Sequence, residues 1–208
     1  MQENIKQHAL IGISNNNSYY SIKNMEKIFS YARKNFQNFN IIVMDDVSIF
    51  NLMALGYNEN KALKKTKRND KCLQNNILKT LEIIGYDIDE SKNKILRYSE
   101  ISKNTKYMEI YEKILTLYKN NEKFCNDCRT LTKNMLSSKL NNINVDNTNL
   151  AIKYLLAELP LCLNSSYILD LDNVIMINKE LSDNWKKIYY EYGLLSNKQK
   201  ILVKSFED

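Results

Sequence analysis

Two short apolar runs joined by a segment with helical spacing constrain the fold of this chain more than any other feature. The runs cover residues 8–14 and 41–44, and both are apolar at almost every position. Such runs are typical of strands buried on both faces, as in a parallel sheet covered by helices. Between them, Ser21 is a candidate N-cap for a helix. A strand, a helix and a strand in this order predict a right-handed βαβ unit with parallel strands.

The rest of the chain favours helices around a small sheet. Long helices are predicted over residues 58–84 and 105–136, and another starts at Thr148 and must kink or end at Pro160. Strands are predicted over residues 94–98 and 174–177, and final helices near residues 183–192 and 197–206. The 208 residues contain four Gly and one Pro, with no repeat and no linker. We therefore expect a single α/β domain over residues 1–208.

The sequence carries no sign of export or of a membrane span. Its first eight residues lack the basic and apolar regions of a secretory signal, and no apolar stretch approaches 18 residues. We therefore expect a cytoplasmic protein with no membrane partner and with reduced cysteines. Cys125 and Cys128 form a CxxC pair inside a predicted helix, and Cys72, Cys162 and His8 lack metal-ligand spacing. We expect no metal and no cofactor, and a redox or metal protein built on the CxxC pair is an alternative.

Ser14 ends the first predicted strand, at the sheet edge where open parallel sheets bind ligands. A hydrolase nucleophile elbow needs Gly two residues after the serine, where this chain has Asn16. The only histidine, His8, lies six residues back on the same strand, about 20 Å away at about 3.3 Å per residue. His8 therefore cannot act as a base for Ser14. The alternative is that Ser14 merely caps a turn or a helix.

Tyr154 and Glu158 are four residues apart on a predicted helix, so their side chains share one face. A carboxylate beside a phenol can hold an ammonium group and later accept its proton, provided that burial raises the carboxyl pKa toward neutrality. The alternative is a surface glutamate beside a tyrosine at the edge of the core.

Basic residues follow one side of the helix predicted over residues 58–84. The chain has a net charge of +6, and acidic residues are scarce within this stripe. A helix with basic side chains along this length could bind the phosphate backbone of a nucleic acid. The simpler explanation of the row is a lysine-rich helix face exposed to water. The members of the stripe are Lys61, Lys64, Lys65, Arg68, Lys71 and Lys79.

Two segments resemble the signature segments of the cyclodipeptide synthases. They cover residues 8–21, with the sequence HALIGISNNNSYYS, and residues 154–161, with the sequence YLLAELPL. Their order and separation match that family, and the second apolar run, Gly56 and the basic helix also have counterparts. The resemblance implies a Rossmann-like domain similar to the catalytic core of class I tyrosyl- and tryptophanyl-tRNA synthetases. It also implies two aminoacyl-tRNAs as substrates, with no need for ATP.

Residue roles follow from the resemblance by position. Ser14 would be the nucleophile that accepts the first aminoacyl group, while Asn17, Tyr154 and Glu158 would hold its α-amine. Glu158 would also move a proton during the second transfer. The pocket for the first side chain would include Leu10, Gly12, Ile42, Met44 and Leu161, and tRNA would be bound by Lys61, Lys64, Lys65, Arg68 and Lys71.

The implied reaction is ping-pong, through an aminoacyl-serine and a dipeptidyl-serine enzyme. In it, the amine of a second aminoacyl-tRNA attacks the seryl ester, and the free amine of the dipeptidyl-enzyme then closes a diketopiperazine ring. The apolar pocket favours hydrophobic amino acids such as Leu, Met or Phe. A non-catalytic tRNA- or RNA-binding module is the alternative. We expect a monomer, whose product downstream tailoring enzymes could modify.

The chain departs from the family pattern at the end of the last predicted strand. Many members carry a tyrosine there, and alignment through Val174 places that site at Met176 or Ile177. The departure puts in doubt a hydroxyl that the family uses for late positioning or proton relay. An ordered water or another of the fourteen tyrosines would have to replace it.

Overall fold

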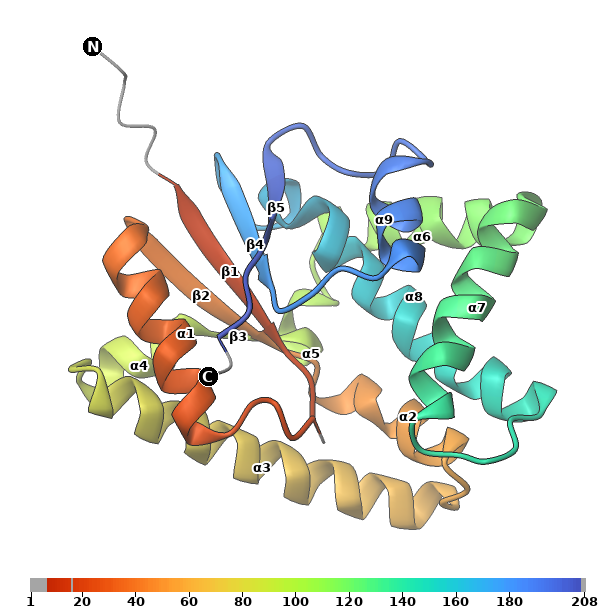
Figure 1. Ribbon diagram of the computed structural model, residues 1–208, viewed down its shortest axis with the longest axis horizontal. Coiled ribbons are helices and arrows are strands. Elements are labelled where there is room, and N and C mark those ends of the chain that lie inside the picture. Colours follow the sequence, from red (N-terminus) through yellow and green to blue (C-terminus); the bar gives the residue numbers. More distant parts are fainter. Residues whose placement is uncertain (1–6, 16, 207–208) are drawn as a thin grey trace.

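A five-stranded parallel sheet forms the centre of the computed structural model, which describes residues 7–15 and 17–206 (Figure 1). Asn16, used above against a nucleophile elbow, lies outside these ranges. The strand order is β3-β2-β1-β4-β5, and every neighbouring pair is parallel. The predicted α/β class and the first βαβ unit are therefore confirmed. The strands are β1 (His8–Ile13), β2 (Asn38–Val43), β3 (Ile95–Arg97), β4 (Val174–Asn178) and β5 (Gln199–Val203).

Side-chain alternation along the strands divides the core into two layers. Ala9, Ile11 and Ile13 of β1 pack with α1 (Ile22–Asn35) and α3 (Glu59–Ile83) on one face. Leu10 points to the other face, which α6 (Thr105–Asn120) and α8 (Val145–Ile168) cover. Both faces of the sheet are thus buried, which explains why the strands are apolar at nearly every position.

The remaining helices are short or lie beside α8. They are a 3₁₀ turn (Asp46–Ser48), α2 (Ile49–Ala54), α4 (Ile88–Lys94), α5 (Tyr98–Ile101), α7 (Glu122–Ser137) and α9 (Asp183–Tyr190). A third apolar layer joins α6, α7, α8 and α9. Ser21 caps α1, because its side chain accepts a hydrogen bond from the Asn24 N–H at 3.3 Å. This cap was predicted.

Three predicted elements differ from the structure. The helix expected over residues 105–136 is two helices, because Asn121 leaves helical geometry and its side chain caps α7 by accepting from the Phe124 N–H. The helix expected over residues 197–206 is the strand β5, which pairs along β4. Its Ile201 and Leu202 face opposite layers of the core, so tertiary pairing overrides the local helical spacing.

Helix α8 also differs at both ends. It begins at Val145, not Thr148, because Asn144 and Asn147 form a reciprocal capping box. It continues past Pro160, and the residue that leaves helical geometry is Asn164. The interruption was therefore predicted four residues too early.

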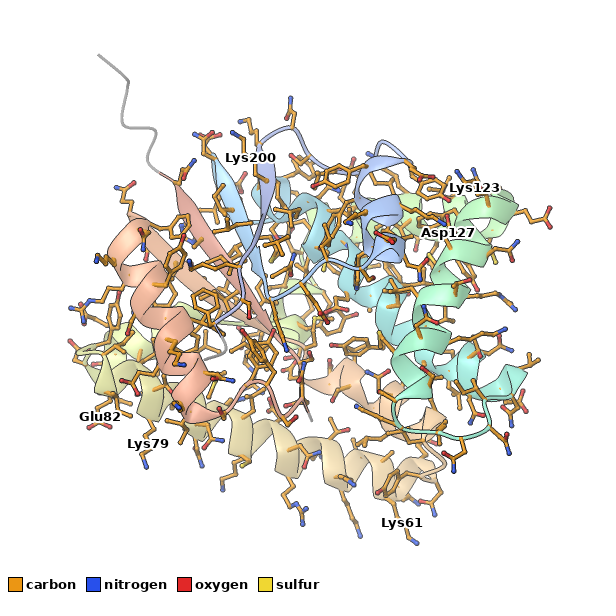
Figure 2. All side chains as sticks on the ribbon, in the orientation of Figure 1. Lys61, Lys79, Glu82, Lys123, Asp127 and Lys200 are labelled. Atoms are coloured by element: carbon orange, nitrogen blue, oxygen red, sulfur yellow. The ribbon has the colours of Figure 1, made fainter. Side chains whose placement is uncertain are left out.

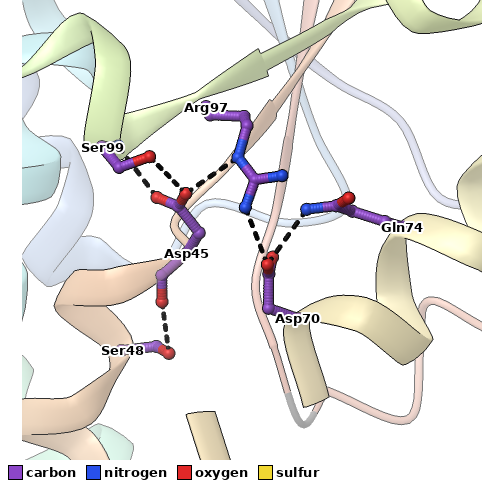
Figure 3. A network of polar contacts seen from close by, with 6 residues as sticks. All are labelled: Asp45, Ser48, Asp70, Gln74, Arg97 and Ser99. Atoms are coloured by element: carbon purple, nitrogen blue, oxygen red, sulfur yellow. Dashed lines mark hydrogen bonds and ion pairs between the residues drawn. The ribbon is translucent and has the colours of Figure 1, made fainter. Parts of the chain in front are cut away.

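A buried carboxylate ties the sheet to α3 (Figure 3). Asp45 follows β2, is 4% exposed, and accepts hydrogen bonds from the Ser99 N–H at 2.9 Å and hydroxyl at 2.6 Å. Arg97 at the end of β3 donates from Nε to Asp45 at 3.1 Å and from a terminal nitrogen to Asp70 of α3 at 2.8 Å. Gln74 also donates to Asp70. This network fixes the rotation of α3 about its axis.

Replacing Asp45 by alanine should lower the free energy of unfolding by about 2–3 kcal/mol, because the Arg97 Nε and the N–H and hydroxyl of Ser99 lose their acceptor, while Arg97 keeps its bond to Asp70. Urea denaturation of the two proteins measures the change. The control is Asp172→Ala, which removes one partner of an exposed ion pair with Lys198 and should leave the midpoint unchanged. Equal effects of the two substitutions would contradict the assignment.

Candidate active site

A cavity of about 650 Å³ opens at the carboxyl edge of the sheet. Its floor is formed by residues from the ends of β1, β2 and β4, and one wall by α8. The opposite wall is formed by the end of α7 and by the segment that leads from β4 through α9. The cavity thus lies where parallel α/β folds bind ligands.

In the described ranges, no helix is long and apolar enough to cross a membrane.

The end of β1 shapes the floor. Gly12 and Ser14 line the cavity, since they share the sheet face of Leu10. A Cβ atom placed on Gly12 would meet no atom within 4 Å, so the absent side chain leaves open space. The Gly12 carbonyl accepts a hydrogen bond from the Tyr20 hydroxyl at 2.8 Å, which holds the following loop against the strand. Ser14 itself is half-buried.

Helix α8 contributes Tyr154, Glu158 and Leu161 to one wall, at the spacing of one helix face. Burial raises the pKa of Glu158 to about 7. The Glu158 residue is not fully enclosed, and it lines the open cavity. Burial also raises the pKa of Tyr154 and of Cys162, and in both cases the Glu158 charge adds to the shift. A carboxyl group that exchanges its proton near neutral pH therefore lies beside a neutral phenol and a neutral thiol.

Most of the unpartnered buried polar atoms of the described chain collect at this cavity. They belong to five residues of its lining, namely Asn15, Tyr19, Asn51, Tyr154 and Asn178. A buried polar group without a partner costs about 1–3 kcal/mol. Their convergence on one open space indicates a polar ligand that supplies the missing hydrogen bonds.

The structure brings most of the predicted site residues together. Asn17 lies at the exposed rim, where its side chain accepts from the Tyr19 N–H at 3.1 Å. Ile42, Met44 and Leu161 line the cavity. Leu10 does not, because it is fully buried in the layer beneath. Its part in the substrate pocket therefore stays a prediction.

Asn51, Asn178 and Tyr189 also line the cavity, although the sequence did not lead us to predict them. Asn178 carried a usable signal, because a polar residue directly after a buried strand lies at the carboxyl edge of the sheet. Asn51 and Tyr189 lie on α2 and α9 and reach the cavity only through tertiary packing. No local pattern marks them.

Met176 lines the cavity, while Ile177 packs on the opposite face of the sheet. A side chain at position 177 therefore points away from the site. Asn178 is the last residue of β4 on the cavity face, so it occupies the strand end that the sequence alignment placed at Met176 or Ile177.

Basic residues of α3 form an exposed row outside the cavity. Lys61, Lys64, Arg68 and Lys71 are exposed, whereas Lys65 is half-buried and donates to the Tyr57 hydroxyl at 2.6 Å. Figure 2 shows Lys61 and Lys79 at the two ends of this helix, both directed away from the sheet. Asp70 turns inward to Arg97, so no exposed acid interrupts the row between Glu59 and Glu82.

The CxxC pair lies in the interior of α7. Cys128 is fully buried, and burial raises its pKa to about 12, while Cys125 is half-buried. A thiol of this kind stays protonated and is a poor nucleophile and metal ligand. Among the residues placed by the structure, no group of three or more His, Cys, Asp or Glu side chains could hold a metal ion.

A parallel α/β fold with an apolar floor, a buried carboxyl and unpartnered polar groups at the carboxyl edge defines an enzyme of Rossmann-like architecture. Comparison with known proteins then identifies the family. A family model described as cyclodipeptide synthase matches residues 3–198, and the chain belongs to that family. It is an aminoacyltransferase of the tRNA-dependent kind.

Two comparisons with Staphylococcus haemolyticus illustrate the similarity. A cyclo(L-leucyl-L-leucyl) synthase is 30% identical over 82% of this chain and 74% of its own. The solved structure of a cyclodipeptide synthase from the same organism superposes with a TM-score of 0.86 at 27% identity, and covers 97% of this chain and 92% of that chain.

More distant structures support the fold. A Mycobacterium tuberculosis structure, described as demonstrating that cyclodipeptide synthetases are related to type I tRNA synthetases, has a TM-score of 0.81 at 23% identity over 94% of this chain and 84% of that chain. A cyclodipeptide synthase from Candidatus Glomeribacter gigasporarum, bound to Phe-tRNAPhe, has a TM-score of 0.60 at 16% identity over 98% and 90% of the two chains. The Rossmann-like prediction is confirmed.

The pKa of Glu158 makes stability depend on pH in a defined direction. Its carboxyl titrates at about 7 in the folded protein and near its ordinary value of 4.5 when unfolded. The unfolded protein therefore loses this proton first, and stability falls as pH rises through this window. Between pH 5 and pH 8, the free energy of unfolding should drop by about 2–3 kcal/mol more in the native protein than in Glu158→Gln. Urea unfolding at both pH values tests this, and a constant difference between the proteins would contradict it.

Proposed function

We propose that this enzyme joins two aminoacyl groups into a cyclic dipeptide through successive esters on Ser14. The observation that carries the proposal is that Ser14, the desolvated Glu158 and the unpartnered Tyr154 hydroxyl line one cavity. The cavity volume of about 650 Å³ lies within the range of ligand sites and gives room for a seryl-bound dipeptide.

In the first half-reaction, the Ser14 Oγ attacks the carbonyl carbon of an aminoacyl-tRNA. The bond from that carbon to the terminal ribose oxygen breaks, and the ribose oxygen leaves with the serine proton. One ester replaces another, so the step is nearly isoenergetic and needs orientation and a proton path more than a strong base. This accounts for a serine nucleophile without a histidine beside it.

Glu158, Tyr154 and Asn17 hold the α-amine of the seryl-bound residue. A carboxyl with a pKa of about 7 is partly ionised at neutral pH, so it can pair with an ammonium group and accept one of its protons. The amine becomes nucleophilic only after this transfer. The Tyr154 hydroxyl has no hydrogen-bond partner in the protein, so it can accept a further hydrogen bond from the ammonium group.

Atom balance decides which amine attacks in the second half-reaction. If the amine of the second aminoacyl-tRNA attacked the seryl ester, as the sequence analysis expected, the dipeptide would remain on the tRNA and Ser14 would be released. A dipeptidyl-serine forms only when the deprotonated amine on Ser14 attacks the second ester, so that the second tRNA leaves. The new terminal amine then attacks the seryl carbonyl, which closes the ring and returns the proton to Ser14.

The substrates that fit the site are hydrophobic amino acids. Ile42, Met44, Leu161 and Met176 give the inner part of the cavity an apolar surface. The relative from Staphylococcus haemolyticus is named for a product of two leucines. We place leucine, with methionine and phenylalanine as alternatives, in the first position. The reaction would take place in the cytoplasm, on a monomer of one domain, and tailoring enzymes could act on the product.

Ser14→Ala should abolish both the covalent intermediate and the product, while tRNA binding survives. The measurement is an acid quench of the enzyme after mixing with radiolabelled leucyl-tRNA, followed by counting of protein-bound label and mass spectrometry of the diketopiperazine. Label on the alanine variant would contradict the nucleophile assignment. A native protein that binds tRNA but forms neither label nor product, with phenylalanyl- and methionyl-tRNA also tested, would support the RNA-binding module instead.

The exposed row of α3 should carry the tRNA backbone. Replacing Lys61, Lys64 and Arg68 together by alanine should weaken tRNA binding and reduce the slope of log affinity against log salt by about 2–3, because each phosphate contact contributes up to about 0.9. Filter binding over a salt series measures this slope. The matched control replaces three exposed lysines on other helices, Lys113, Lys123 and Lys186. Equal slopes for the two triple variants would overturn the assignment.

A further inference from the structure

We propose that Asn178 is a further catalytic residue, whose side-chain N–H donates a hydrogen bond to the carbonyl oxygen of the ester under attack. The inference rests on the proposed function, because it concerns the ester formed at Ser14. It starts from a donor that the fold places at the reaction edge and leaves unused.

Sheet geometry places Asn178 beside the nucleophile. The β1–β4 register pairs Ile11 with Ile177, so Asn178 lies next to Gly12 on the neighbouring strand, about 4.8 Å away. Gly12 and Asn178 face the same side of the sheet, and Ser14 follows two residues after Gly12 on that side. Gly12 has no side chain between them. The carboxamide and the hydroxyl therefore border the same open space.

The Asn178 Nδ2 atom is buried and has no hydrogen-bond partner. An amide N–H can only donate, so it cannot bind the ammonium group of the substrate. The acceptor that the proposed reaction brings to this edge is the ester carbonyl oxygen. That oxygen gains negative charge when Oγ or an amine attacks the carbonyl carbon, so a fixed donor stabilises the transition state more than the ground state.

Tyr189 of α9 lies beside the carboxamide. Its side chain is 3% exposed, lines the cavity and interacts with the side chains of Asn178 and of Cys162 on α8. The Asn178 backbone carbonyl accepts from the Lys204 N–H at 2.9 Å, which anchors the strand end on its other side. Tyr189 is thus a positioning residue that acts through Asn178.

Two variants of Asn178 separate a lost donor from an added charge. Asn178→Leu has a similar shape without polar atoms, and Asn178→Asp replaces the donor by an acceptor. Both should slow the labelling of the protein by radiolabelled leucyl-tRNA by about 100-fold or more, the usual effect of removing one such donor. Affinity for tRNA, measured by filter binding, should stay unchanged. The control is Asn141→Leu in an exposed loop, which should label at the native rate.

The outcomes separate this inference from the proposed function. If the native enzyme labels and Asn178→Leu labels equally fast, Asn178 is not a donor to the ester. If only the aspartate variant is slow, its charge is the cause and the proposal is again overturned. If the native enzyme itself takes no label from leucyl-, methionyl- or phenylalanyl-tRNA, the proposed function fails first. Thermal unfolding of each variant shows whether slow labelling reflects lost structure.

A double-mutant cycle tests the positioning role of Tyr189. Tyr189→Phe should slow labelling in the native background and have no further effect in Asn178→Leu, because the hydroxyl acts only through the carboxamide. Additive effects of the two substitutions would show that Tyr189 supports the fold independently, and would contradict its assignment.

Discussion

The structure depends on a parallel sheet whose two faces are both covered, so that only its edges meet solvent. β1 is the centre of this arrangement, with β2 and β4 as its partners. Alternate residues of a strand serve opposite apolar layers, and polar groups gather at and beyond the carboxyl ends of the strands. Ser14, Asp45 and Asn178 all occupy such positions. The groups proposed for catalysis and the structural polar groups therefore gather at the same edge, because the inner positions of β1 and β4 serve the apolar layers on both faces.

The polar groups at this edge divide into two kinds. Asp45 has its hydrogen bonds filled by Ser99 and Arg97, so it ties strands and helix together. By contrast, the Tyr154 hydroxyl is buried without a partner and desolvation raises the pKa of Glu158, so both groups reduce stability until a ligand arrives. The contrast between the paired carboxylate of Asp45 and the desolvated carboxyl of Glu158 separates the structural network from the candidate site without reference to any relative.

The sequence was sufficient for the sheet core and for much of the site, and it failed where tertiary packing decides. The apolar runs, the Ser21 cap and the strand-end position of Ser14 are local signals. The break at Asn121 depends on a side-chain cap, and β5 depends on pairing with β4, so the local apolar pattern misassigned both. Leu10 lies in the layer below the cavity floor, and the depth of a residue below that floor is not visible in strand alternation. Tyr189 comes from a helix 35 residues beyond Tyr154, and no spacing connects the two.

The open space above Gly12 has a consequence for how enzymes of this design can diversify. Its backbone adopts an ordinary strand conformation, and a Cβ atom would enter the cavity without striking a neighbouring atom. One added methyl group would therefore narrow the cavity while leaving the packing of the sheet intact. It would also stand between Ser14 and Asn178, so the size of this floor residue bears on the cavity volume and on the proposed donor together.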